Sequence, residues 1–116
     1  MTDSILTSIK KLLGMTEDYT AFDTDIIIHI NTVFMILHQM GVGPEEGFRI
    51  EDKYATWDEY VTEEDNLDAV KTYIYLKVKL IFDPPLSGSA VESINRAISE
   101  YEWRLNFQAE SNKEEV

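Results

Sequence analysis

The stretch LDAVKTYIYLKVKLIFDPP, residues 67–85, constrains the fold of this chain more than any other part of the sequence. At the helical rotation of about 100° per residue, its apolar side chains fall on two stripes that lie nearly opposite each other. One stripe contains Leu67, Val70, Ile74, Val78 and Ile81, and the other contains Ala69, Tyr73, Leu76 and Leu80. Because only one arc is polar, such a helix must be covered on most sides by other helices. The pattern predicts the central helix of a small bundle, which begins near Asp65 or Asn66 and ends at Phe82, before two prolines.

A short helix at the N-terminus and a long helix at the C-terminus are predicted from apolar residues at spacings of three and four. The short helix can be capped by Thr2 or Asp3 and ends at Gly14. The long helix opens with a capping box formed by Ser89 and Glu92. Their apolar positions are Ile5, Leu6, Ile9, Leu12 and Leu13 in the first, and Val91, Ile94, Ile98, Tyr101 and Leu105 in the last.

The second helix is predicted to run to Met40, with Gly41 directly after it. With Asp23 as its N-cap, Phe22 and Ile27 occupy the two positions of a hydrophobic staple. The β-branched run IIIHI inside this segment favours a strand by propensity alone. The helical period continues for about seventeen residues, however, which is too long for an ordinary strand. We therefore interpret the segment as a helix.

The segment from Gly43 to Glu64 is irregular and strongly acidic. Ten acidic residues lie between Glu45 and Asp68, against only two basic ones, Arg49 and Lys53. Its aromatic residues can hold it as a solvated loop against the core, or the segment can be a contact loop that faces a partner or a lumen. The sequence leaves both interpretations open.

Length and composition indicate one domain without covalent cross-links. A chain of 116 residues can build a single core, and the absence of cysteine excludes disulfides and thiolate metal sites. The fold class expected is all-α: a small four-helix bundle-like domain over residues 1–107, with the acidic loop between the second and third main helices. Residues 108–116, QAESNKEEV, are polar and acidic and are predicted to form a mobile tail. No secretory signal is recognisable, so synthesis is expected to end in the cytoplasm.

The net charge of −12 argues against nonspecific attraction to DNA or to anionic membranes, because both depend on basic residues. No apolar run is long enough to cross a membrane. The acidity fits two explanations. It can serve solubility, or it can form a wall of carboxylates that repels DNA and keeps it from adhering.

No pattern of a catalytic site is present, and we expect neither enzymatic activity nor a cofactor or metal. His29 and His38 lie nine residues apart on one helix, so they point to opposite sides. A carboxylate cluster at Glu63, Glu64, Asp65 and Asp68 resembles half of the metal site of helical nucleotide pyrophosphohydrolases. Those enzymes need a second acidic pair on a facing helix, which this sequence does not offer. We therefore set the hydrolase reading aside.

Several strings of this sequence together resemble the tailed-phage head–tail connector, or adaptor, proteins. These strings are AFDTDIIIHINTVFMILHQMGVGP, GFRI, TWDEY, YIYLKVKLIFDPP and ISEYEWRLN, in that order along the chain. The resemblance covers roughly residues 5–107. It implies an all-α structural virion protein that assembles as a closed cyclic ring beneath the portal.

The resemblance also implies partners and a location. They are other copies of the chain, the portal protein, and a stopper or tail-completion protein, with DNA passing through the channel without specific binding. The location implied is the head–tail interface of the virion, after assembly in the host cytoplasm. By position, the candidates for partner contact are Trp57, Asp58 and Tyr60 in the acidic loop and Trp103, Arg104 and Phe107 in the last helix. Trp103 and Phe107 lie off the main apolar stripe of that helix, where they can be ordinary core cover, the interpretation we favour from the pattern, or part of a surface that packs against a neighbouring subunit.

A different class of function fits the charge alone. A small acidic phage-encoded inhibitor can mimic DNA phosphates and block a basic nucleic-acid enzyme. Such a protein binds its target as a monomer or dimer, whereas a connector assembles into rings with the portal.

Overall fold

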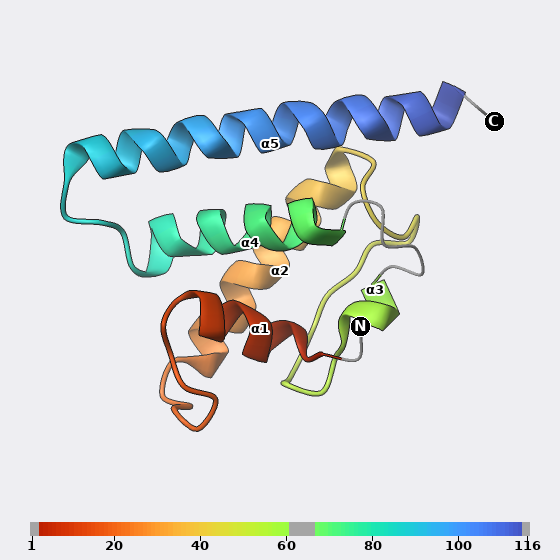
Figure 1. Cartoon of the computed structure of the whole chain (residues 1–116). Coiled ribbons are helices and arrows are strands. Elements are labelled where there is room, and N and C mark those ends of the chain that lie inside the picture. Colours follow the sequence, from red (N-terminus) through yellow and green to blue (C-terminus); the bar gives the residue numbers. More distant parts are fainter. Residues whose placement is uncertain (1–2, 61–66, 115–116) are drawn as a thin grey trace.

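The computed structural model describes residues 3–60 and 67–114, with side chains described up to residue 110. These residues form five helices: α1 (Ile5–Leu12), α2 (Asp23–Gln39), α3 (Trp57–Tyr60), α4 (Leu67–Phe82) and α5 (Gly88–Glu114). Within the described part of the chain the only β pairing is one isolated bridge between Ser4 and Thr56. The predicted all-α class is confirmed (Figure 1).

Helix α4 lies at the centre of the domain, as its apolar pattern predicts. It runs between α5 and α1, and α2 crosses behind it (Figure 1). The shortest dimension of the domain is 19 Å, which corresponds to two layers because packed helices lie about 8–10 Å apart. The domain is therefore flat, with α1, α4 and α5 in one layer and α2 in the other.

The two stripes of α4 are covered to different degrees. In the first stripe every residue is buried except Ile81, which lies in the last turn and is exposed. In the second stripe Tyr73 is buried, while Ala69, Leu76 and Leu80 are partly buried against the core. The first stripe faces the core, and Tyr73 of the second stripe is bonded to Glu102 on α5, so the central-helix prediction holds. Both predicted starts of this helix, Asp65 and Asn66, lie outside the described residues.

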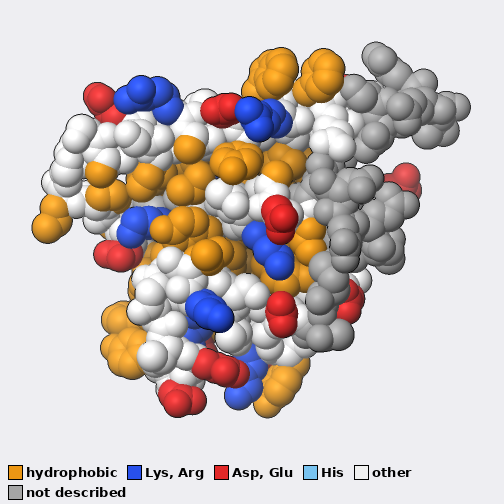
Figure 2. All heavy atoms as spheres, viewed as in Figure 1, with side chains coloured by type: hydrophobic (Ala, Val, Ile, Leu, Met, Phe, Trp, Pro, Cys, Tyr) orange, Lys and Arg blue, Asp and Glu red, His pale blue; other side chains and the backbone are white. Residues whose placement is uncertain are grey.

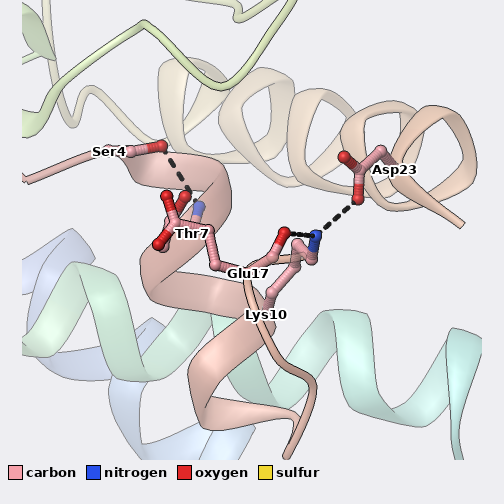
Figure 3. A network of polar contacts seen from close by, with 5 residues as sticks. All are labelled: Ser4, Thr7, Lys10, Glu17 and Asp23. Carbon is pink, nitrogen blue, oxygen red and sulfur yellow. Dashed lines mark hydrogen bonds and ion pairs between the residues drawn. The ribbon is translucent and has the colours of Figure 1, made fainter. Parts of the chain in front are cut away.

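The N-cap of α1 differs from the prediction. Ser4 is the capping residue, and its Oγ accepts a hydrogen bond from the backbone N–H of Thr7 at 3.2 Å (Figure 3). Of the two predicted caps, Thr2 lies outside the described residues, and the backbone carbonyl of Asp3 instead accepts from the N–H of Trp57. The sequence offers three adjacent capping residue types, and the contact with residue 57 selects among them.

The start of α5 also lies earlier than the predicted capping box. Helix α5 begins at Gly88, and the Ser87 Oγ accepts from the backbone N–H of Ala90 at 3.3 Å. Ser89, the predicted cap, lies inside the helix and its hydroxyl contacts that of Ser87 at 2.9 Å. Both serines suit an N-cap, so the sequence pattern alone could not separate them.

Asp23 is the first residue of α2 and not the cap that the sequence predicts. Its carboxylate forms an ion pair at 2.9 Å with Lys10, whose side chain is only 3% exposed (Figure 3). Lys10 also donates to the backbone oxygen of Glu17 at 3.1 Å. The buried Asp23 Oδ1 has no polar partner other than Lys10 among the described residues, so the lysine charge is what compensates its burial. The pair ties α1 to the beginning of α2.

Helix α5 continues to Glu114, through most of the segment that the sequence predicts as a tail. Ile98 and Leu105 are its buried residues among those described, and both belong to the predicted apolar stripe. Beyond them Ala109 is half-buried, and a Cβ built on Gly41 would lie 3.6 Å from its Cβ. This small-residue contact with the end of α2 extends the packed part of the helix past Phe107. A polar sequence does not reveal such a contact.

Gly43 gives a first testable prediction, because its backbone has a φ of +95° and lies against the ring of Tyr60. A Cβ at this position would lie 2.8 Å from the Tyr60 hydroxyl oxygen. We expect Gly43→Ala to lower the free energy of unfolding by about 2–4 kcal/mol, as the sum of backbone strain and overpacking. Urea denaturation followed by circular dichroism measures the loss.

Gly14→Ala is the matched control. Gly14 has a similar φ of +86°, but no atom lies within 4 Å of a Cβ built there. We expect this variant to show only the backbone strain of about 1–2 kcal/mol. Equal losses in the two variants would contradict the close contact between Gly43 and Tyr60.

Candidate interaction surface

Two of the six predicted contact residues, Trp57 and Tyr60, lie in the hydrophobic core. Their exposed fractions are 0% and 4%. The ring of Tyr60 lies 4.8 Å from that of Phe34 and 5.3 Å from that of Phe48, measured between centroids. Burial raises the pKa of the Tyr60 hydroxyl above its ordinary value. In this fold neither side chain reaches the surface, so we correct their assignment from partner contact to core packing. Asp58, between them, is exposed.

Helix α3 is held against α1 by main-chain and side-chain hydrogen bonds. The backbone N–H of Ile5 donates to the carbonyl of Ala55 at 3.0 Å. The indole Nε1 of Trp57 donates to the Ser8 Oγ at 3.1 Å, and the ammonium group of Lys71 lies 5.3 Å from the ring centroid. These contacts turn the ring of Trp57 inward.

Asn31 fixes the middle of the acidic loop, a role that the sequence analysis missed. Its Nδ2 donates to the backbone oxygen of Ile50 at 2.8 Å, and the N–H of Ile50 donates back to its Oδ1 at 2.8 Å. The His38 Nε2 lies 2.9 Å from the backbone oxygen of Glu45 and adds a second attachment. An amide inside the apolar run of α2 was the available signal. The loop is thus bound to α2 while its carboxylates Glu45, Glu46, Glu51 and Asp52 are exposed.

Trp103 and Phe107 form an exposed aromatic surface on the outer side of α5, which we call the aromatic plate. Their exposed fractions are 67% and 59%. The two rings are stacked, with centroids 5.4 Å apart and planes inclined by 14°. Figure 2 shows hydrophobic side chains projecting from the upper edge of the molecule, along α5. Arg104 beside them is exposed and bonded to Glu100 at 2.6 Å. The predicted residues of α5 are therefore available for contact.

The rotation of α5 that turns the plate outward is fixed from its inner side. The hydroxyl of Tyr73 on α4 donates to a carboxylate oxygen of Glu102 at 2.7 Å. Burial, and then the Glu102 carboxylate, raise the pKa of Tyr73 above its ordinary value, as expected for a buried hydroxyl that donates to a carboxylate. Because Glu102 faces α4, the next residue, Trp103, is rotated by about 100° toward solvent.

A second aromatic cluster lies where the α1–α2 connection meets the end of α4. Phe22 contacts Phe82 with ring centroids 5.3 Å apart, and Tyr19 lies 5.8 Å from Phe22. Tyr19 and Phe22 are 48% and 40% exposed. The sequence predicts that Phe22 precedes the N-cap of α2 and forms a staple with Ile27. In the structure Phe22 is itself the N-cap residue, and its ring packs on Phe82 of α4. The sequence analysis found no motif in this connection.

The described residues contain no group of three or more His, Asp or Glu side chains that could hold a metal ion. Three of the four carboxylates considered above, Glu63, Glu64 and Asp65, lie outside them. Among the described helices, none combines the length and the apolar character needed to cross a bilayer.

The fold and its surface define a class: a small all-α domain with exposed aromatic surfaces and, among the described residues, no metal-binding cluster. The family model described as phage connector protein matches residues 5–112. The chain therefore belongs to the phage connector protein family, which confirms the resemblance seen in its sequence. No curated protein and no solved structure shows a significant match to it.

Membership sets the general role of this protein. The family is one of structural proteins, so the chain has a structural connector role. It is a component of the virion, and it interacts with other phage head or tail proteins.

Proposed function

We propose that this protein is a head–tail connector that forms a closed ring beneath the portal, extends the DNA channel and docks tail-side components. The observation that carries the proposal is the family match over residues 5–112. The exposed plate of Trp103 and Phe107 supports it, because large exposed apolar surfaces on small proteins mark contacts with other chains.

The partners proposed are further copies of the chain, the portal protein, and a stopper or tail-completion protein. A closed ring requires heterologous contacts, in which one surface of a subunit packs on a different surface of its neighbour. Assembly takes place in the host cytoplasm, and the finished protein lies at the head–tail interface. Of the predicted contact residues, we retain Asp58, Trp103, Arg104 and Phe107.

The acidity of the chain supports the proposed passage of DNA without specific binding. The net charge is −12, and exposed carboxylates cover the outer side of the loop at residues 45–59. Carboxylates repel phosphates and release no counterions on contact, so they give DNA no site to adhere to. The role is mechanical: the ring continues the channel and offers a surface for the next component.

Negative-stain microscopy of the protein mixed with the portal protein of the same phage tests the proposal. We expect an added annulus at the narrow end of the portal. Portal particles alone, and portal particles mixed with an unrelated protein of similar size and charge, are the controls. Portal particles of unchanged outline at saturating amounts of the protein would overturn the proposal.

The acidic inhibitor has only the net charge in its favour, and the connector role accommodates that charge equally well. The family match gives the inhibitor no support.

A further inference from the structure

In the described part of the chain, two clusters of exposed aromatic side chains lie at opposite ends of the domain. The aromatic plate is on the second half of α5, about 22–28 Å along that helix from its first residue at a rise of 1.5 Å per residue. The other surface, which we call the end patch, comprises Tyr19, Phe22 and Phe82 together with Ile81 and Leu86, which are exposed at the same end of α4. Figure 1 shows this end beside the α4–α5 connection, away from the C-terminal half of α5.

We propose that the aromatic plate of one copy packs against the end patch of the next copy. The inference deepens the proposed function and rests on it, since it names the two surfaces that join neighbouring subunits. A contact between two different surfaces leaves one of each free at the ends of any chain of copies. It is therefore the type of contact from which a ring can close.

Each of the two surfaces is accompanied by an ion pair, and the end patch also has exposed carboxylates beside it. A surface ion pair at i, i+4 flanks each of them: Glu100 with Arg104 on either side of Trp103, and Lys79 with Asp83 on either side of Phe82. Each pair cancels its own charge. Two chains of net charge −12 repel each other, and Glu17 and Asp18, which are exposed beside Tyr19, add to this repulsion, so the apolar contact has to outweigh it.

The exposed area is also of the size that a stable contact needs. With about 150–250 Å² for a fully exposed aromatic side chain, the plate presents about 280 Å². The same reckoning gives the end patch roughly 400 Å², including Ile81 and the fully exposed Leu86. Together these apolar areas are on the order of 700 Å², and with a polar rim the contact reaches about 1,200 Å², the lower end of the standard interface size.

Sedimentation velocity on the full chain tests the contact through two double variants. The plate variant carries Trp103→Ser and Phe107→Ser, and the end variant carries Tyr19→Ser and Leu86→Ser. All four positions are exposed, so unchanged thermal unfolding is expected to show that both variants fold. We expect each variant alone to associate at least about tenfold more weakly than the parent chain, as for the loss of a central aromatic contact.

Mixing the two variants gives the sharpest result. The plate variant retains its end patch and the end variant retains its plate, so one intact contact remains and the mixture forms dimers but nothing larger. If the plate instead packed on a second plate, the end variant alone would associate like the parent chain and the mixture would form no mixed dimer. That result would overturn the inference. Association should also strengthen with added salt, because salt screens the repulsion between like charges.

Cross-linking extends the test to the assembled state. Because the chain contains no cysteine, an introduced cysteine is the one thiol that can react. Ser99→Cys places a thiol beside the plate, and Thr20→Cys places one beside the end patch, both at exposed positions. We expect a short bismaleimide to join the two variants when they are mixed, either concentrated alone or bound to portal, and to join neither to itself.

The outcomes separate this inference from the proposed function. An annulus on the portal without the mixed cross-link, in the same sample, would overturn the inference and leave the connector role standing. A mixed cross-link in the free protein without an annulus would support the contact and count against the portal role. Absence of both would overturn both.

Discussion

Replacing Trp57 with alanine is expected to lower the free energy of unfolding by about 3–5 kcal/mol, the cost of removing a large aromatic side chain from a packed core. Trp57 is fully buried, its indole N–H is bonded to Ser8, and Lys71 lies over its ring. Because small domains are stable by only about 5–15 kcal/mol, much of the protein should be unfolded near physiological temperature. Urea denaturation followed by circular dichroism measures the change.

Trp103→Ala is the matched control, since it removes the other tryptophan of the chain from an exposed site. We expect it to change the free energy of unfolding by at most about 0.5 kcal/mol and to weaken only association. If Trp57→Ala unfolded at the same urea concentration as the parent chain and lost only portal binding, the assignment of Trp57 to the core would be wrong.

Asn31→Ala is also expected to have a large effect and to lower the free energy of unfolding by about 2–4 kcal/mol. The substitution removes both hydrogen bonds between residue 31 and Ile50. The backbone N–H and C=O of Ile50 then lose their partner, and Ile50 is only 1% exposed. Each unsatisfied buried polar group costs about 1–3 kcal/mol. Chemical denaturation measures the loss, with Thr32→Ala at the neighbouring exposed position as a control of small effect.

Asn31→Asp gives this prediction a pH signature. An ionised carboxylate still accepts from the N–H of Ile50 but repels its carbonyl oxygen, which raises the pKa of the new acid in the folded state. A raised pKa stabilises the fold below the unfolded-state pKa of about 3.9 and ceases to do so as the pH rises through the folded-state pKa. The deficit of this variant relative to the parent chain should therefore shrink in acid. A deficit that is independent of pH would contradict the paired contact with Ile50.

The sequence predicted the helices because their signals are local. The two stripes and the terminal prolines identify α4 without reference to any other segment, and the structure ends that helix at Phe82 as predicted. The run IIIHI forms a helix although its β-branched residues favour a strand, because a sustained period outweighs propensity. The residues that cap α1 and α5 were missed by one or two positions, since neighbouring serine, threonine and aspartate residues carry equal signals.

The aromatic contact candidates on the last helix are exposed, whereas those in the acidic loop are buried. Trp103 and Phe107 lie off the apolar stripe of a regular helix, where the sequence favoured core cover over a contact surface, and the structure shows both side chains exposed. Trp57 and Tyr60 lie in an irregular segment, where no period relates sequence position to direction. The pairing of Asn31 with Ile50, and of Asp3 with Trp57, decides which side of that loop faces the core.

By itself the sequence determined an all-α domain with a covered central helix, an acidic composition, and membership in the phage connector family. Only the tertiary structure decided that Trp57 and Tyr60 of the acidic loop are buried, that the aromatic plate faces outward, that Lys10 and Asp23 join two helices, and that Tyr19 and Phe22 meet the end of α4. The physical reason is range: periodicity and capping act within about four residues, whereas these contacts join segments that only the folded chain brings together.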